Sequence, residues 1–227
     1  MSSSLSEAVR AKLTQVAEPA RAPAMQAYMK SDMPYLGVSA VPLRKACKDL
    51  FVGLSWSDRT GWEADVLSIW RDAEFREDRY AAIELCDHRA ARVFRQVSAL
   101  PMYQEMIVSG AWWDYIDNIA ARFLWPILQN DRAAMTAAML TWSTDDDIWK
   151  RRSAILCQLP AKAETDFDLL EACIAPSLGS KEFFLRKAIG WALRQYARTD
   201  PDAVRRYVAA QADKLSGLSR REALKHL

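Results

Sequence analysis

The sequence has few histidines and cysteines, which are the usual protein ligands of zinc and other transition metals. It has only two histidines, His88 and His226, and its four cysteines stand singly at positions 47, 86, 157 and 173. No spacing pairs the histidines with each other or with cysteines as ligands, so the sequence predicts no metal site and indicates no cofactor. Single cysteines in apolar or helical segments are typical of reduced, buried thiols in a cytosolic protein.

Several sequence motifs of common enzymes are missing as well. The chain has no GxGxxG or GxxxxGK[ST] loop for nucleotide phosphates, and no GxSxG motif for an acyl-transfer serine. Its N-terminus lacks the basic flank and apolar run of a signal peptide, and no apolar stretch approaches the length of a membrane-spanning helix. We therefore expect a cytoplasmic protein that makes no membrane contact.

Glycine is scarce too, with 7 residues in 227, and no strand pattern or Asn-Gly or Asp-Gly hairpin signal is present. Nearly every segment instead has the apolar spacing of an amphipathic helix. Expected helix starts are Ser39, Ser57 or Asp58, Pro101, Asp145 to Asp147, and Asp200 before Pro201. The sequence therefore predicts an all-α fold.

The helices come in pairs at intervals of roughly 35–45 residues, which is the period of HEAT-like α-solenoid repeats. At 227 residues the chain is long enough for one such array, so we predict a single domain over residues 1–227. No crisp repeat consensus is present, and a compact, irregular helical bundle is the alternative.

The run Ala-Trp-Trp-Asp-Tyr-Ile-Asp at 111–117 is the most informative segment. On a helix, Trp112 begins a core stripe that continues through Ile116, Ile119 and Phe123. Trp113 lies off that stripe and shares a face with Asp117, one turn further on. An aromatic plane beside a carboxylate can form the wall of a binding groove. A half-buried Trp beside a solvated Asp is the alternative.

The helix expected over residues 181–197 also has two faces. Leu185, Ile189, Ala192 and Tyr196 form its core ridge, whereas Lys187, Trp191, Arg194 and Arg198 share another side. A tryptophan among basic residues suits a nucleic-acid backbone, and a cation–π pair on a solvated face is the alternative. Gly190 inside this helix indicates a close helix crossing.

Basic residues are concentrated at the end of the chain. Residues 181–227 carry 11 Lys and Arg against 5 Asp and Glu, a net charge of +6 in a chain with a net charge of +2. This asymmetry indicates a local surface for an anionic partner. Ser219 is expected to cap a last helix, whose basic residues Arg220, Arg221 and Lys225 would bind phosphates. Arg152 borders a core-facing side and needs either an internal carboxylate or a phosphate.

These segments together resemble the DNA alkylation repair family, the AlkD-like DNA glycosylases built from HEAT-like repeats. The resemblance covers nearly the whole chain. The matching segments are Tyr-Met-Lys at 28–30, Tyr-Leu-Gly at 35–37, Trp-Trp-Asp-Tyr-Ile-Asp at 112–117, Trp-Lys-Arg-Arg-Ser-Ala-Ile-Leu at 149–156, residues 180–194 and residues 218–226.

The resemblance implies a role for particular residues. The catalytic carboxylate of the family corresponds to Asp117, its two cleft tryptophans to Trp113 and Trp191, its cleft arginine to Arg152, and its groove tyrosine to Tyr28. The residues expected to bind DNA are then Tyr28, Arg152, Lys187, Arg194, Arg220, Arg221 and Lys225. Its own sequence context instead favours packing of Tyr28 against its neighbours over a place in a groove.

The resemblance further implies a concave DNA-binding face and excision of cationic N3- or N7-alkylated purines from double-stranded DNA. The reaction would be monofunctional hydrolysis without base flipping, the first step of base excision repair. Such a protein would act in the cytoplasm, with the nucleoid in a bacterium, and one groove of DNA size needs only a monomer. The alternatives are a non-catalytic DNA-binding member and a helical-repeat scaffold for a protein partner.

Overall fold

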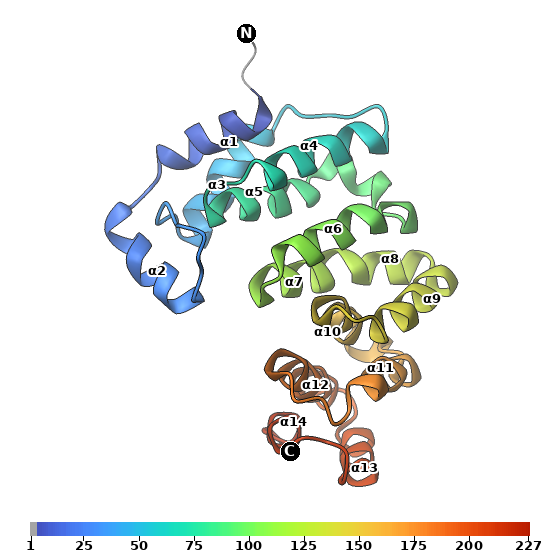
Figure 1. The fold of residues 1–227 in the computed structure, drawn as a ribbon. Helices are drawn as coiled ribbons and strands as arrows, with labels where there is room; N and C mark the ends of the chain where they lie inside the picture. The colour runs from blue at the N-terminus through green and yellow to red at the C-terminus, as the bar shows by residue number, and fades with distance from the viewer. Residues whose placement is uncertain (1–3) are drawn as a thin grey trace. The chain divides into compact units, whose positions relative to one another are not determined.

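The computed structural model describes residues 4–227, which contain helices and no strand (Figure 1). The all-α prediction is therefore confirmed. Within these residues, no helix is both long and apolar enough to cross a membrane. Short 3₁₀ turns connect several helices, and one π-helical segment spans Ala120–Leu124.

The described chain divides into two compact units, one ending at Arg95 and the other spanning Gln96–Leu227. The single domain over residues 1–227 stays a prediction. The first unit has the helices α1 (Leu5–Thr14), α2 (Ala22–Met29), α3 (Ala40–Phe51), α4 (Arg59–Arg71) and α5 (Arg76–Cys86). The second has α6 (Leu100–Gly110), α7 (Trp113–Ile119), α8 (Trp125–Asn130), α9 (Arg132–Ser143), α10 (Ile148–Leu156), α11 (Phe167–Ile174), α12 (Phe183–Tyr196), α13 (Pro201–Ala210) and α14 (Gly217–Ala223).

In the first unit, α1, α3 and α4 all pack against α5. The buried carboxylate of Glu77 on α5 accepts backbone N–H groups from Leu36, Gly37 and Val38 at 2.9–3.0 Å, which fixes the loop after α2. Gly37 has φ +88°, and a Cβ there would lie 2.1 Å from the Glu18 carbonyl oxygen, so only glycine fits.

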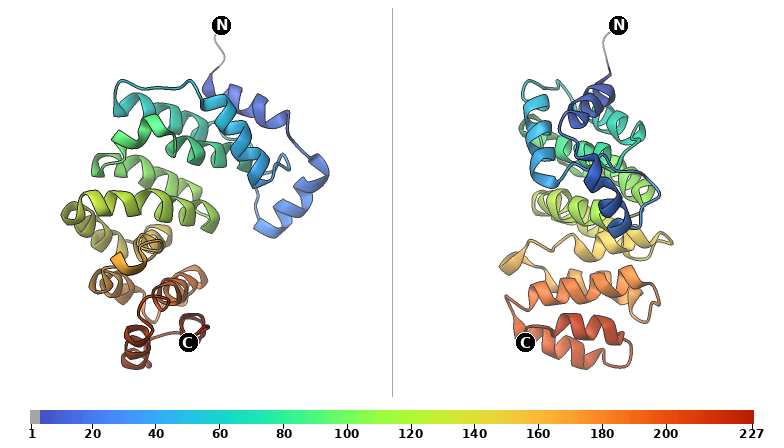
Figure 2. Two further views of the ribbon diagram at one scale, coloured as in Figure 1. Left: turned by 180° about the vertical axis from the view of Figure 1, so that it is seen from behind. Right: turned by 90° about the vertical axis from the view of Figure 1, so that its left-hand side faces the viewer.

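In the second unit, helices that are close in sequence pack together in a stack. α9 packs against α10 and α11, α10 against α12, and α12 against α13 and α14. Figure 2 shows the later helices of this unit as successive layers. This stacking of neighbours is the arrangement of a helical-repeat array.

Most of the predicted helix starts are confirmed. The side chains of Asp58, Asp147 and Asp200 accept backbone N–H groups at the N-termini of α4, α10 and α13, and Pro101 lies in the first turn of α6. Ser39 precedes α3, although its side chain makes no capping hydrogen bond. The prediction for Ser219 was wrong, because Ser216 caps α14 while the buried Ser219 hydroxyl donates to the Arg186 carbonyl.

The double-tryptophan segment follows most of the predicted stripe. Ile116, Ile119 and Phe123 are fully buried. Trp112 is not on the helix but is the extended N-cap residue of α7, and it is half-buried. Beyond α7 the backbone passes through the π-helical segment, and such segments frequently lie at functional sites.

Candidate active site

One pocket in the second unit contains most of the predicted site residues. Its volume is about 320 Å³. Four helices contribute to it, so residues separated by more than 100 positions line the same pocket. The lining residues are Trp113 and Asp117 from α7, Arg152 from α10, Phe183, Phe184, Lys187, Trp191 and Arg194 from α12, and Glu222 from α14.

Asp117 and Arg152 form a bidentate ion pair at the base of this pocket. Arg152 Nε donates to Asp117 Oδ1 at 2.8 Å, and a terminal guanidinium nitrogen donates to Oδ2 at 2.9 Å. The other terminal nitrogen donates to the Phe184 carbonyl oxygen at 2.6 Å. The sequence left a carboxylate or a phosphate open for Arg152, and the structure provides the carboxylate. Contact of Arg152 with DNA stays a prediction.

Burial and neighbouring charges shift the pKa of Asp117 in opposite directions. Only 13% of its side chain is exposed, and this burial raises the pKa of the carboxyl above its ordinary value. The hydrogen bond and charge of Arg152 lower the pKa in part, whereas nearby Asp114 raises it. Because both oxygens accept N–H groups, the observed geometry is that of an ionised carboxylate.

Aromatic side chains surround this carboxylate. Trp113 and Trp191 are half-buried, so part of each ring is accessible from the pocket. Behind them, Phe184 contacts Trp149 and Trp112, with ring centroids 4.9 and 5.5 Å apart. This aromatic packing fixes the position of the α12 N-terminal turn against α7 and α10.

The opposite wall is formed by α12 and α14 and carries three charges. Glu222 Oε1 accepts from Lys187 Nζ at 2.9 Å, and Glu222 Oε2 pairs with Arg194. The hydrogen bond from Lys187, together with the charges of both cations, lowers the pKa of Glu222 below its ordinary value. The basic face predicted on this helix is therefore partly neutralised.

Gly190 allows this arrangement, as its sequence context indicated. A Cβ on Gly190 would lie 2.5 Å from Glu222 Cβ and 2.9 Å from the Ser219 carbonyl oxygen. No side chain larger than hydrogen fits between α12 and α14 at this point without a shift. The close crossing places Glu222 between Lys187 and Arg194.

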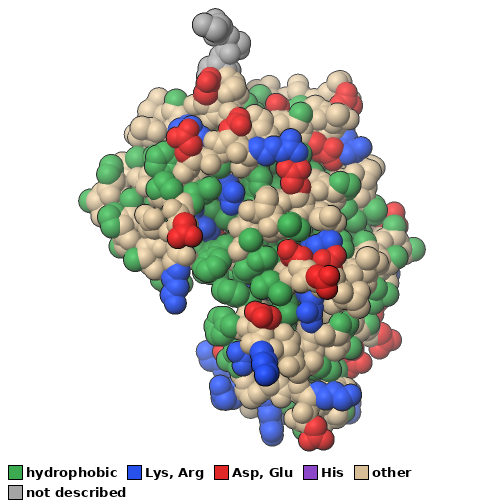
Figure 3. Space-filling model, in the orientation of Figure 1, with side chains coloured by type: hydrophobic (Ala, Val, Ile, Leu, Met, Phe, Trp, Pro, Cys, Tyr) green, Lys and Arg blue, Asp and Glu red, His purple; other side chains and the backbone are tan. Residues whose placement is uncertain are grey.

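The other predicted site residues lie outside this pocket. Arg220 and Arg221 on α14 and Lys225 after it are exposed, and Figure 3 shows Lys and Arg side chains gathered over this end of the unit. Tyr28 belongs to α2 of the first unit, and 78% of it is exposed. A DNA contact by any of these four residues stays a prediction.

Sequence reasoning missed Phe183, Phe184 and Glu222. Phe183 is 52% exposed in the pocket lining, and its position one helical turn before Lys187 was an available signal in the sequence. Glu222 had no such signal, because its cationic partners lie 28 and 35 residues away in sequence. Only the helix crossing at Gly190 brings these charges together.

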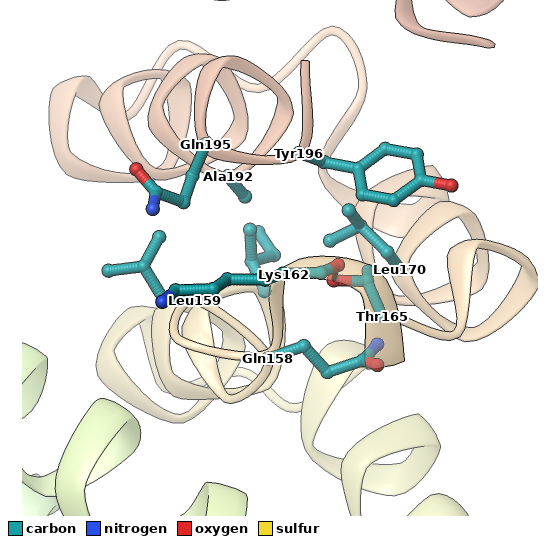
Figure 4. Close-up of a pocket in the computed structure, with 9 residues that line it drawn as sticks. Gln158, Leu159, Lys162, Thr165, Leu170, Ala192, Gln195 and Tyr196 are labelled. Atoms are coloured by element: carbon teal, nitrogen blue, oxygen red, sulfur yellow. Dashed lines mark hydrogen bonds between the residues drawn. The ribbon is translucent and has the colours of Figure 1, made fainter. Parts of the chain in front are cut away.

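Two other hollows of the second unit have different properties. The one shown in Figure 4, between α12 and the segment after α10, has a volume of about 10 Å³, which is room for a single water. A wider hollow of about 410 Å³ between α11 and α13 is lined in part by Asp168 and Glu171. The first hollow is too small for any part of DNA, and in the second the two carboxylates outnumber the one cation, Arg206, which disfavours a polyanion.

The fold and the pocket together define a class: an all-helical protein of stacked helices with a buried carboxylate in an aromatic and basic pocket. A family model for the DNA alkylation repair enzyme matches residues 9–227, and the chain belongs to this family. A solved structure of a predicted DNA alkylation repair enzyme from Enterococcus faecalis is similar to it, with a TM-score of 0.83 and 27% sequence identity. The similarity covers 93% of this chain and 96% of that one. A comparison with curated proteins gave no match.

Proposed function

We propose that this chain is a DNA glycosylase that hydrolyses the N-glycosidic bond of cationic N3- or N7-alkylated purines in double-stranded DNA. The observation that carries the proposal is the Asp117 carboxylate, held through both of its oxygens by Arg152 in a pocket bordered by Trp113 and Trp191. Membership in the DNA alkylation repair family supports DNA as the substrate. The reaction would begin base excision repair.

The chemistry of the substrate explains why one carboxylate suffices. Alkylation at N3 or N7 makes the purine cationic, so the C1′–N9 bond breaks with its electron pair leaving on a neutral alkylpurine. No residue has to protonate the base. The remaining sugar has oxocarbenium character, which a nearby carboxylate stabilises, as in glycoside hydrolysis. Water then adds to C1′ and gives up a proton, leaving a free base and an abasic site.

Two features of Asp117 support a role in both parts of this reaction. Each of its oxygens accepts one N–H from Arg152, which leaves one further lone pair on each oxygen for a water or a sugar. The pair with Arg152 reduces the net negative charge but fixes the carboxylate in one orientation. The raised pKa makes Asp117 a better acceptor for the proton of the attacking water than an ordinary aspartate.

The neighbouring residues would bind the DNA around the lesion. The faces of Trp113 and Trp191 would hold the deoxyribose and favour its cationic character. Lys187 and Arg194 would contact backbone phosphates, along with Arg152, Tyr28 and the C-terminal Arg220, Arg221 and Lys225. Because these contacts would be made to the DNA backbone, we propose excision without base flipping. We also propose that the protein acts as a monomer in the cytoplasm.

The alternative function is that of a non-catalytic DNA-binding protein or a scaffold for a protein partner. A scaffold for a protein partner predicts an apolar or acidic face, whereas this pocket contains Trp191 between Lys187 and Arg194. A DNA-binding protein without activity would share Lys187, Arg194 and the C-terminal basic residues, and it differs from the proposal in releasing no base.

Base release from two matched duplexes tests the proposal. One duplex carries a single N7-methylguanine, which is cationic, and the other carries hypoxanthine, a neutral base, at the same position. We expect free 7-methylguanine and an alkali-labile abasic site from the first duplex, and no release above the enzyme-free rate from the second. Binding to both duplexes without release from either would support the non-catalytic alternative.

A further inference from the structure

Glu222 connects the two basic residues that lie on either side of Trp191. Lys187, Trp191 and Arg194 occupy successive turns of one face of α12, and Glu222 reaches this face from α14. Each carboxylate oxygen pairs with a different cation. The Glu222 side chain is 19% exposed, so the pairing is partly shielded from solvent.

The backbone crossing fixes where Glu222 lies. The close contact at Gly190 and the hydrogen bond from the Ser219 hydroxyl to the Arg186 carbonyl both hold α14 against α12. These contacts therefore hold Glu222 in one position between Lys187 and Arg194. A flexible surface glutamate would not have this constraint.

We propose that Glu222 is a positioning residue that presents Lys187 and Arg194 as a preformed pair of cations to a DNA phosphate beside Trp191. The proposal rests on the function given above. Glu222 uses one donor of the Lys187 ammonium and one terminal nitrogen of Arg194. Since an ammonium has three N–H donors and a guanidinium five, donors are left over for a phosphate.

The benefit of such positioning is conformational. Ordering a long, flexible side chain on binding costs about two- to twelvefold in affinity, and two side chains are ordered here in advance. The charge of Glu222 acts in the opposite direction, because removing one negative charge near a DNA-binding surface strengthens binding. A useful experiment has to separate these two effects.

Glu182 provides the matched control for charge. It lies at the N-terminus of the same helix, its side chain is exposed, and it makes no side-chain capping hydrogen bond. Glu222→Gln and Glu182→Gln change the net charge equally, but only Glu222→Gln disrupts the cation pair. With fluorescence anisotropy on a labelled undamaged 20-base-pair duplex, we expect Glu222→Gln to bind about fivefold or more weakly than Glu182→Gln.

Glu222→Asp tests the same point without any change of charge. Its side chain is one methylene shorter, so it cannot pair with both cations in their present positions. We expect it to bind the duplex several-fold more weakly than the wild type. Binding equal to the wild type would contradict a role that depends on position.

A third comparison distinguishes positioning of the two cations by Glu222 from a role of Glu222 in holding α14 against α12. In a Lys187→Met, Arg194→Met background, the difference between Glu222→Gln and Glu182→Gln should disappear, because the cations through which Glu222 acts are gone. A difference that persists there would mean that Glu222 only holds α14 in place, and the proposal would be wrong.

Equal or tighter binding by Glu222→Gln than by Glu182→Gln in the wild-type background would also overturn the proposal. Glu222 would then compete with phosphate for the cations. All three arms measure binding to undamaged DNA, so they remain valid if the protein releases no base. Failure of the glycosylase proposal and failure of the positioning proposal are therefore distinguishable.

Discussion

The two walls of the pocket each contain a carboxylate, and their environments differ. Asp117 on α7 is buried and pairs with one cation, Arg152, and burial raises its pKa. Glu222 on α14 is somewhat more exposed and pairs with two cations, which lower its pKa. Burial dominates at the first wall, and the partners dominate at the second.

This difference suggests a division of roles between the walls. A buried carboxylate with a raised pKa suits proton transfer and charge stabilisation at a reacting sugar. A carboxylate that two cations keep ionised is poorly suited to accept a proton, and its proposed role is instead to order Lys187 and Arg194 for a phosphate. The predictions below test this contrast, beginning with the largest expected effect.

The stability of the protein should fall strongly when one partner of the Asp117–Arg152 pair is removed. Arg152→Met removes the guanidinium and leaves a buried carboxylate unpaired, so we expect the free energy of unfolding to fall by about 3–5 kcal/mol. Chemical denaturation monitored by circular dichroism measures this. The double variant Asp117→Leu/Arg152→Met should recover most of the lost stability, because no uncompensated charge is left.

A loss of no more than about 1 kcal/mol in the free energy of unfolding of Arg152→Met would contradict the difference between the two walls. A change of that size is typical of an exposed ion pair. The Asp117 wall would then be no more shielded from solvent than the Glu222 wall, and burial would not account for the raised pKa of Asp117.

The stability of the protein should also depend on the close crossing of α12 and α14 at Gly190. Gly190→Ala places a methyl group against Glu222 and the Ser219 backbone. Overpacking costs about 1–3 kcal/mol, and the better helix propensity of alanine offsets up to about 1 kcal/mol, so we expect a net loss of about 1–2 kcal/mol. The same denaturation experiment measures it.

Gly53→Ala is the matched control for that variant. A Cβ on Gly53 meets no atom within 4 Å, so this change should leave stability unchanged or slightly higher. If Gly190→Ala were as stable as Gly53→Ala, the crossing would not be tight, and Glu222 would not be constrained between its cations.

The elements that the sequence predicted well depend on local interactions. Asp58, Asp147 and Asp200 cap the helices that follow them, and a cap acts within three residues of itself. The faces of α12 were predicted for the same reason, because helical periodicity alone places Lys187, Trp191 and Arg194 together. The predicted cap Ser219 failed because of a contact with a distant segment: its hydroxyl donates to the Arg186 carbonyl of α12, and Ser216 caps α14 instead.

The parts that sequence reasoning missed depend on contacts between distant segments. Glu222 meets Lys187 and Arg194 only because α14 crosses α12 at a glycine. The pairing of Arg152 with Asp117 likewise depends on how α7 packs against α10. Spacing along one helix shows which of its residues share a face, but not which residues of distant segments join that face or pair with it.

The central claim is that the ionised Asp117 carboxylate performs the chemistry. The most direct test is the single-turnover release of 7-methylguanine by wild type and Asp117→Asn across a pH range, with the enzyme-free rate subtracted. The account predicts a loss of about 10²–10⁴ in Asp117→Asn with duplex affinity retained. The wild-type rate should fall about tenfold per pH unit below an inflection above the ordinary aspartate pKa, because protonation removes the active form. An Asp117→Asn variant that releases base at the wild-type rate would contradict the claim.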